Sequence, residues 1–332
     1  MSCNRGELMM LGIYFMLLFA GCFSVVNERL DPAKSSVSRH ILNRPGIAND
    51  GSIVVSSGGR ISTTLHRNRE LITLATFQND QFAPLVSSSK DQVVSFQFLN
   101  GNGYVNSTSL IGLTDVNRSY NLGKMITVPV AFSPTKRHLL VYAYSSDGLG
   151  QGVVMSPSIL DLFSGKLFKV GDNAIVDCTG THLLVLKGRD LWAALLDNPT
   201  KMERVASDLN PLAIASDGRK AIVTKEDDSL QLLDISTGIL TPLMTKGHSA
   251  LFLRDDNAIA VVEGDENSIS LVSIGNFTSR RLTEWTAFNT LPISSNNGRF
   301  FVFERFDDEF GMSRSIFVYD HDSEELGRYS IE

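Results

Sequence analysis

The sequence contains little tryptophan, cysteine or proline, with 2 Trp, 3 Cys and 10 Pro in 332 residues. Its longest apolar run, residues 8–20, is shorter than the roughly 20 residues that a bilayer-spanning helix needs. After this run apolar residues do not recur at helical spacing, which excludes a mainly helical fold. The chain is nevertheless 43% hydrophobic, so it can bury one large core or several small ones.

Motifs of several enzyme classes are absent as well. There is no Gly-X-Ser-X-Gly nucleophile elbow and no EF-hand calcium loop. The six histidines share no metal-ligand spacing, and His138 and His182 each precede a Leu-Leu-Val segment, which indicates a repeated structural position. A net charge of −6 makes nucleic acid a poor partner. The sequence therefore predicts no metal site, no cofactor and no identifiable catalytic residue. A pair of carboxylates for glycoside hydrolysis, brought together by the fold, stays an open alternative.

The N-terminus has the pattern of an export signal. The apolar run 8–20 has the length of a signal-peptide core. It leads into Leu18-Phe-Ala-Gly-Cys22, which resembles the lipobox of bacterial lipoproteins, where small residues precede a cysteine that becomes acylated. This resemblance implies a signal peptide over 1–21, lipidation at Cys22 and a tether over 22–44. Because Phe23 and Ser24 follow in place of Asp, it also implies an outer-membrane lipoprotein facing the periplasm. The alternative is an ordinary secretory signal that is cleaved a few residues later.

From residue 45 onward one pattern recurs seven times. Each unit opens with a short segment of small residues or proline, followed by a turn, an apolar strand, a polar loop and two more strands. The clearest copy is Pro211-Leu-Ala-Ile-Ala-Ser-Asp-Gly218 followed by strands at 220–224, 230–235 and 240–243. Units of roughly 35–45 residues with four strands each are typical of β-propeller blades. The sequence therefore predicts an all-β fold over 45–332, a propeller of seven blades, with six or eight as alternatives.

Tight turns support this division into units. Asp217-Gly218 and Asn297-Gly298 fall at matching positions in their units, and such pairs accept the positive φ angles of hairpin turns. Unit seven contains all four of its strands, although residues 37–42 offer a further strand for closing the ring. Cys178 is placed on the innermost strand of unit four as a small buried apolar residue. A β-sandwich and a β-helix are the alternative folds.

Units five to seven resemble the repeats of TolB-like and related WD40-like propellers. Those repeats run from a small strand through Ser-Pro-Asp-Gly-Lys to two apolar strands and a final Leu-Thr. The corresponding segments here are Ala215-Ser-Asp-Gly-Arg-Lys220, Ser294-Ser-Asn-Asn-Gly-Arg299 and Arg280-Arg-Leu-Thr283, and Phe132-Ser-Pro-Thr-Lys136 is a partial copy. The resemblance covers about two-thirds of the chain. It implies a propeller and leaves the activity open, because this fold supports both binding and catalysis.

Acidic residues gather in the loops predicted between the second and third strands of several units. The residues are Asp190, Glu226, Asp227, Asp228, Glu263, Asp265, Glu266, Asp307, Asp308 and Glu309. From residue 129 onward the chain has nineteen basic and twenty-eight acidic residues, whereas 22–128 has ten and seven. These loops leave one face of a propeller, so we expect an acidic rim that attracts a basic partner protein or a divalent cation. The alternative is a set of ordinary solvated hairpin loops.

These patterns favour binding over catalysis. The sequence predicts an exported, lipid-anchored propeller that binds or scaffolds a protein partner at the bacterial cell envelope. The alternative is an exported enzyme of the lactonase or glycan-cleaving kind, with its site at the central channel. The sequence identifies neither a partner nor a small-molecule ligand.

Overall fold

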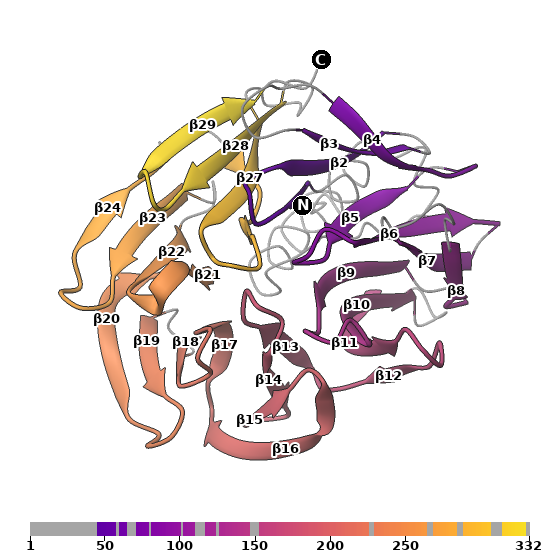
Figure 1. The fold of residues 1–332 in the computed structure, drawn as a ribbon. Helices are drawn as coiled ribbons and strands as arrows, with labels where there is room; N and C mark the ends of the chain where they lie inside the picture. The colour runs from indigo at the N-terminus through magenta and orange to yellow at the C-terminus, as the bar shows by residue number, and fades with distance from the viewer. Residues whose placement is uncertain are drawn as a thin grey trace, which may run out of the picture.

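The structure, a computed structural model, describes twelve stretches of the chain between residues 45 and 329. They are residues 45–57, 60–64, 71–79, 81–100, 102–109, 117–123, 126–146, 153–225, 229–263, 268–283, 288–306 and 314–329. These stretches form seven antiparallel sheets arranged in a ring (Figure 1). Among the described residues no helix has the length and apolarity to cross a membrane.

The first four sheets, called blades 1 to 4, are each made from a contiguous part of the chain. Blade 1 holds β1 (Gly46–Ile47), β2 (Ile53–Ser57), β3 (Arg60–Thr64) and β4 (Leu71–Thr76). Blade 2 holds β5 (Phe82–Val86), β6 (Gln92–Leu99), β7 (Asn102–Ser109) and β8 (Asn117–Asn121). Blade 3 holds β9 (Ile126–Phe132), β10 (His138–Ser146), β11 (Val153–Asp161) and β12 (Leu167–Lys169). Blade 4 holds β13 (Asn173–Val176), β14 (His182–Lys187), β15 (Asp190–Leu195) and β16 (Asn198–Ser207).

The remaining three blades follow the same plan. Blade 5 holds β17 (Asn210–Ile214), β18 (Lys220–Thr224), β19 (Ser229–Asp234) and β20 (Leu240–Lys246). Blade 6 holds β21 (Ser249–Phe252), the 3₁₀ turn η1 (Arg254–Asp256), β22 (Ala258–Glu263), β23 (Ser268–Ser273) and β24 (Ser279–Arg281). Blade 7 holds β25 (Phe288–Asn289), β26 (Ile293–Ser294), β27 (Phe300–Phe306), β28 (Arg314–Asp320) and β29 (Glu325–Tyr329).

The predicted propeller of seven four-stranded blades is confirmed. Within each blade the strands pair in chain order, from the innermost strand at the channel to the outermost strand at the rim (Figure 1). The innermost strand is not uniform among the blades. In blade 3 it starts at Ile126, and in blade 7 it is split into β25 and β26, which both pair with β27.

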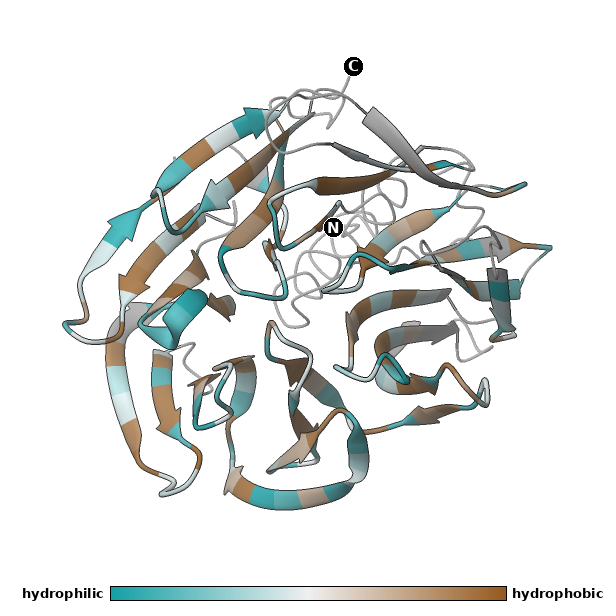
Figure 2. Ribbon diagram, viewed as in Figure 1, coloured by the Kyte–Doolittle hydropathy of each residue, from teal (hydrophilic) through white to brown (hydrophobic). Residues whose placement is uncertain are grey.

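The core consists of layers between neighbouring blades, as expected when alternate residues of a strand face opposite sides. Between blades 6 and 7, for example, Ala260 and Val262 of β22 pack with Phe301 and Phe303 of β27. The opposite side of β27 presents Val302 to blade 1. The apolar residues accordingly lie along the strands and the polar residues in the turns (Figure 2).

One turn, between the first and second strands, occurs in all seven blades. It begins at Ala48, Ser87, Ser133, Asp177, Ala215, Leu253 and Ser295. Its fourth residue donates its N–H to the carbonyl of the first over 2.8–3.1 Å and has a positive φ of 53–80°. Asp217-Gly218 and Asn297-Gly298 occupy the last two positions of this turn, in agreement with the sequence prediction. We call the side of the ring with these turns the turn face, and the opposite side the loop face.

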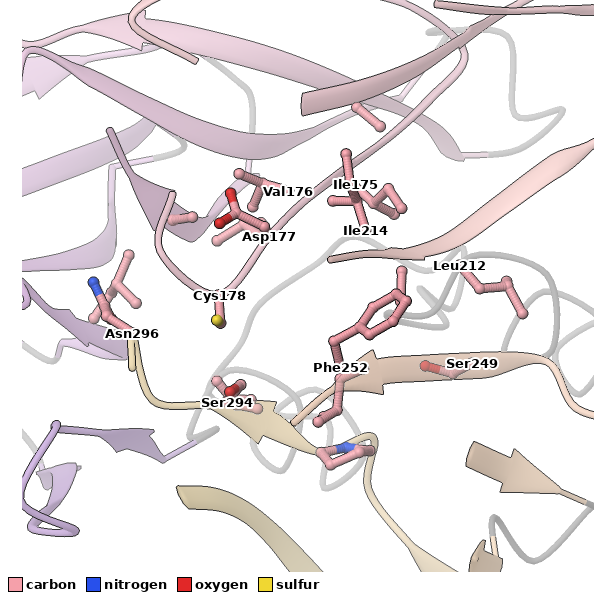
Figure 3. Close-up of a pocket in the computed structure, with 18 of the residues that line it drawn as sticks. Ile175, Val176, Asp177, Cys178, Leu212, Ile214, Ser249, Phe252, Ser294 and Asn296 are labelled. Carbon is pink, nitrogen blue, oxygen red and sulfur yellow. The ribbon is translucent and has the colours of Figure 1, made fainter. Parts of the chain in front are cut away.

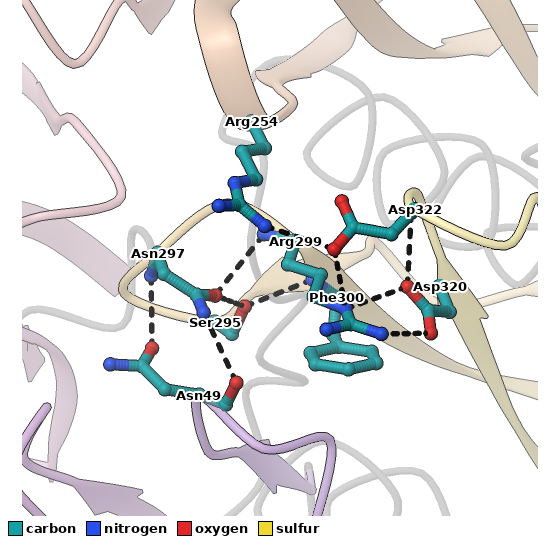
Figure 4. A network of polar contacts seen from close by, with 8 residues as sticks. All are labelled: Asn49, Arg254, Ser295, Asn297, Arg299, Phe300, Asp320 and Asp322. Atoms are coloured by element: carbon teal, nitrogen blue, oxygen red, sulfur yellow. Dashed lines mark hydrogen bonds and ion pairs between the residues drawn. The ribbon is translucent and has the colours of Figure 1, made fainter.

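Contacts between these turns join the blades into a belt and close the ring. Asn297 of blade 7 donates its N–H to Asn49 Oδ1 (2.9 Å) and its Nδ2 to the Asn49 carbonyl (3.1 Å). Asn49 also donates its Nδ2 to the Ser88 carbonyl of blade 2 (3.3 Å). Figure 4 shows Asn49 beside Asn297, and the ion pairs of Arg299 with Asp320 and Asp322 close by. The described part of blade 7 takes no strand from blade 1. Residues 37–42, predicted as a closing strand, lie outside the described residues.

Blades 1 and 2 meet differently from the others. Val93 of β6 packs on blade 1. The next two residues on the same side of this strand, Ser95 and Gln97, are polar. Together with Gln81 and Asn106 they form a buried hydrogen-bonded cluster, with Asn106 Nδ2 donating to both glutamine Oε1 atoms over 2.8–2.9 Å. The bonds satisfy the amides, which would otherwise be costly to bury. This seam therefore combines an apolar part, formed by Val54, Ile61, Val86 and Val93, with a polar cluster that belongs to blade 2.

Candidate functional site

The central channel contains a cavity of about 220 Å³. Six of the seven innermost strands, from all blades except blade 1, place two or more residues along it, and blade 1 contributes Gly46. Apolar side chains dominate the wall, as the close-up shows for Ile214, Leu212 and Phe252 (Figure 3). The cavity is thus a narrow apolar space with polar groups at its two ends.

Proline is frequent along this wall, at Pro84, Pro129, Pro211 and Pro292. The innermost strand is the edge of each blade, and an edge strand leaves backbone N–H groups without a partner. Proline has no N–H and therefore suits this edge. Gly46 lies close to the backbone of this wall. A side chain there would clash, because its Cβ would come within 2.6 Å of the Pro84 carbonyl oxygen. The small residues and prolines that open each unit of the sequence were the signal for this channel. No site residue was predicted from them.

Hydrogen bonds link blades 3, 4 and 5 at the loop-face end of the channel. Tyr142 donates its hydroxyl to the Ala174 carbonyl (2.5 Å) and approaches Asn173 Oδ1 at 3.1 Å. Asn173 in turn donates its Nδ2 to Asn210 Oδ1 over 3.0 Å. His248 also lines the cavity, directly before β21. These groups provide donors and acceptors beside an otherwise apolar wall.

Asp177 is the carboxylate at the turn-face end. Its Oδ1 accepts the N–H groups of Thr181 and His182, both at 2.7 Å. Its Oδ2 accepts the Thr179 N–H (3.1 Å) and the Thr179 hydroxyl. Burial raises the pKa of this carboxyl, and the bonds from Thr179 and His182 oppose that rise. With four donors from its own turn, Asp177 stabilises the turn and has little capacity left for a ligand.

The Cys178 side chain is directed into the cavity, with Ser294 and Asn296 of blade 7 on the opposite side (Figure 3). The prediction that Cys178 lies on the innermost strand is wrong, since β13 ends at Val176 and the cysteine lies in the turn after it, half-buried. Burial, together with the nearby Asp177 and Asp256, raises the thiol pKa to about 12. The thiol is therefore protonated at neutral pH and is a weak nucleophile.

The structure describes two of the ten predicted acidic rim residues. Asp190 opens β15 on the loop face, where its Oδ1 accepts a hydrogen bond from Arg204 Nε (2.8 Å), and Glu263 ends β22, paired with Ser268 across the hairpin. The other eight lie outside the described residues: Glu226, Asp227, Asp228, Asp265, Glu266, Asp307, Asp308 and Glu309. Cys22 lies outside them too. The acidic rim and the lipid anchor stay predictions.

Two further sequence interpretations concern histidine. His138 and His182 are both the first residue of the second strand of their blades, as their repeated spacing indicated. The His182 ring packs against Gly218 of blade 5, whereas His138 Nδ1 of blade 3 lies 3.9 Å from Asp197 Oδ1 of blade 4. Over the described stretches, no three His, Cys, Asp or Glu side chains come together in a way that could hold a metal ion.

Comparison with known proteins gives structural neighbours alone. No family model matches the sequence, and no curated protein does. TolB from Acinetobacter baumannii aligns at 15% identity with a TM-score of 0.46, over 84% of this chain and 60% of its own. Oligogalacturonate lyase in complex with manganese aligns at 15% identity with a TM-score of 0.48, over 71% of this chain and 73% of its own. The tricorn protease aligns at 14% identity with a TM-score of 0.36, over 85% of this chain and 30% of its own. This chain thus spans under two-thirds of TolB and under a third of the tricorn protease. The strand topology itself makes this chain a seven-bladed β-propeller, the architecture that its repeats led us to expect.

Proposed function

We propose that this propeller is a binding module of the bacterial cell envelope, anchored through Cys22, whose central channel receives an apolar side chain or short peptide segment of a protein partner. The observation that carries the proposal is the cavity of about 220 Å³ on the ring axis. Drug-sized ligands occupy sites of roughly 300–1,000 Å³, so this space suits a side chain better than an oligosaccharide. The partner's remaining contacts would lie on the face around the channel mouth.

The chemistry of the wall supports binding. Ile214, Leu212 and Phe252 offer apolar contact, while Tyr142 and Asn173 place hydrogen-bonding groups at one end. This combination of an apolar wall and a few polar groups is typical of recognition sites. The enzyme alternative requires a group in the channel that can transfer protons or attack a substrate. Asp177 is occupied by its turn and the Cys178 thiol is protonated, so neither supports that alternative.

The test is affinity capture of partner proteins from solubilised membranes with the acylated full-length protein. Ala131→Phe fills the channel from the wall of β9. Ser236→Phe, on an exposed turn away from the channel, is the matched control for adding an aromatic ring. A third variant replaces the six acidic residues at 226–228 and 307–309 by their amides. The proposal expects Ala131→Phe to lose one specific partner that Ser236→Phe retains.

Each arm has a contradicting result. If Ala131→Phe captures the same proteins as the unaltered chain, the channel is not the binding site. Unchanged capture by the amide variant removes the acidic rim from the interface. Cys22→Ala should release the protein from membranes in soluble form, and a variant that stays bound would contradict the lipid anchor.

A further inference from the structure

Asparagine precedes glycine in the turn that closes the ring. The structure describes all seven turns between first and second strands, and among them only the turn of blade 7 has this pair, Asn297-Gly298. Glycine has no Cβ to hinder an attack of its nitrogen on the preceding side chain. Asparagine followed by glycine is therefore the dipeptide that loses its side-chain amide most readily. Asn297 is also exposed, so water reaches this position.

The turn itself does not require asparagine here. In blades 1 and 5 the equivalent residues are Asp50 and Asp217, and the Oδ1 atom of each accepts the N–H of the residue two positions later over 2.8–3.0 Å. Asn297 Oδ1 accepts the Arg299 N–H in the same way (3.2 Å). What asparagine adds is a donor, since its Nδ2 donates to the Asn49 carbonyl of blade 1 over 3.1 Å (Figure 4). The amide therefore serves ring closure, and an aspartate would serve the turn equally well.

Gly298 connects the same turn to blade 6. Its carbonyl accepts the Arg254 N–H over 2.9 Å. A Cβ at Gly298 would come within 3.0 Å of the Arg254 nitrogen, so the two turns are in close contact there. A longer main chain between Asn297 and Gly298 would consequently disturb the contact with blade 6 as well as the contact with blade 1.

We propose that Asn297 is a site of spontaneous deamidation, and that the closed ring restrains the reaction. The Gly298 nitrogen loses its proton and attacks Asn297 Cγ. A C–N bond forms, the bond from Cγ to Nδ2 breaks, and Nδ2 leaves as ammonia with that proton, which gives a succinimide. Water then hydrolyses the succinimide. Breaking its bond from nitrogen to Cγ gives aspartate, and breaking its bond from nitrogen to the backbone carbonyl carbon gives isoaspartate, whose main chain runs through Cγ and is longer by one carbon.

The closed ring holds both reacting groups in place. The Gly298 N–H donates to the Ser295 carbonyl over 2.9 Å. The Asn297 side chain is bonded to Asn49, to the Ser295 hydroxyl and to the Arg299 N–H. Attack requires the side chain and the main chain to rotate together, so these bonds have to break first. The reaction therefore starts from a locally opened seam, and its rate follows the population of that open state.

Both products oppose renewed closure. An aspartate keeps the turn, as in blades 1 and 5, but it places a carboxylate oxygen opposite the Asn49 carbonyl, where two acceptors face each other. An isoaspartate lengthens the main chain beside the Gly298 contact with blade 6. Each reaction thus makes later openings more frequent, and the seam between blades 7 and 1 is weakened irreversibly.

The test incubates the full-length chain in heavy-oxygen water at mildly alkaline pH. Peptide mapping by mass spectrometry measures how fast the label enters position 297, and electron-transfer fragmentation separates aspartate from isoaspartate. Asn102-Gly103 of blade 2 is the internal reference, because the Gly103 N–H donates to the Gly123 carbonyl within that blade (2.7 Å). Asp217→Asn is the matched variant, since it places the same dipeptide in the same turn of blade 5, where Asp217 bonds to the Arg219 N–H of its own hairpin.

The proposal expects Asn49→Ala to raise the rate at position 297 about five- to thirty-fold, because the seam opens more often by that factor. The rate at position 102 should not change. Position 217 of the matched variant should react faster than position 297 of the unaltered chain. Asn297→Asp reproduces one product and should accelerate hydrogen exchange in blades 1 and 7 together, whereas Asp217→Asn should not.

Three outcomes overturn the proposal. The first is a rate at position 297, or an absence of label there, that Asn49→Ala leaves unchanged. The second is an equal acceleration at positions 102 and 297, which would mean that the reaction proceeds from the wholly unfolded chain. The third is unaltered exchange in blades 1 and 7 of Asn297→Asp, which would mean that the product leaves the ring closed.

Discussion

Asn49 is expected to hold the ring closed, and its replacement by alanine tests this directly. The side chain accepts the N–H of Asn297 in blade 7 and donates to the Ser88 carbonyl in blade 2, so one amide joins three consecutive blades. Asn49→Ala removes both bonds. At about 0.5–1.5 kcal/mol for each hydrogen bond, and with the site exposed, we expect a loss of about 1–2 kcal/mol in the free energy of unfolding.

The location of the effect is the sharper test. Hydrogen exchange should accelerate in blades 1 and 7 together, because opening at this seam frees both. Asn276→Ala is the matched control, since the Asn276 side chain also makes two hydrogen bonds, with its Oδ1 accepting from the Thr278 N–H and hydroxyl, but within a single turn of blade 6. It should change exchange in its own turn alone. If Asn49→Ala leaves exchange in blade 7 unaltered, or changes all seven blades equally, the reasoning on ring closure is refuted.

Three further predictions concern the packing and charge of the blades. Gly218→Ala and Gly238→Ala both impose a left-handed alanine, at a cost of about 1–2 kcal/mol, but only at Gly218 would the new Cβ lie 2.4 Å from the His182 ring. Urea denaturation should therefore show the larger loss for Gly218→Ala, and equal losses would contradict the contact. Phe301→Ala empties a site that is fully buried and 5.0 Å from the Tyr319 ring, so thermal unfolding should reveal a loss of about 3–5 kcal/mol. Burial opposes ionisation of Asp161, yet the N–H groups of Ser164 and Phe163 and the Arg137 guanidinium lower its pKa to about 2 from 3.8. The folded-state pKa is the lower one, so this carboxylate stabilises the fold above pH 3.8 by about 2 kcal/mol and loses that contribution as the pH falls towards 2. The difference in unfolding free energy between the unaltered chain and Asp161→Asn should shrink accordingly between pH 5 and pH 2.5, and a constant difference would contradict the assignment.

The repeat pattern predicted the architecture because each blade is local in sequence. Strand spacing and the Asp217-Gly218 turn lie within single units, so reading along the chain is enough to locate them. Ring closure is different, since Asn49 and Asn297 are 248 positions apart and no local pattern joins them. The amide cluster around Gln81 and Asn106 escaped prediction for a different reason, because its members lie within blade 2 but come together only through the register of its strands.

The candidate site was only partly accessible from the sequence. The acidic residues in the loops led to the prediction of an acidic rim. The channel is built from small and apolar residues, and none of these has a distinctive chemistry by itself. The prolines at 84, 129, 211 and 292 recur at the start of their units, and this recurrence was the usable signal.

The self-contained blades have a consequence for how such a chain can change. Where closure depends on a strand donated from the far end of the chain, cutting or lengthening the ring disrupts two distant regions at once. Here each described sheet is made from one continuous segment, so new termini can be opened between blades by circular permutation, and a unit can be duplicated or removed as one block of sequence. A gene for this chain can therefore alter the diameter of its ring in a single recombination event.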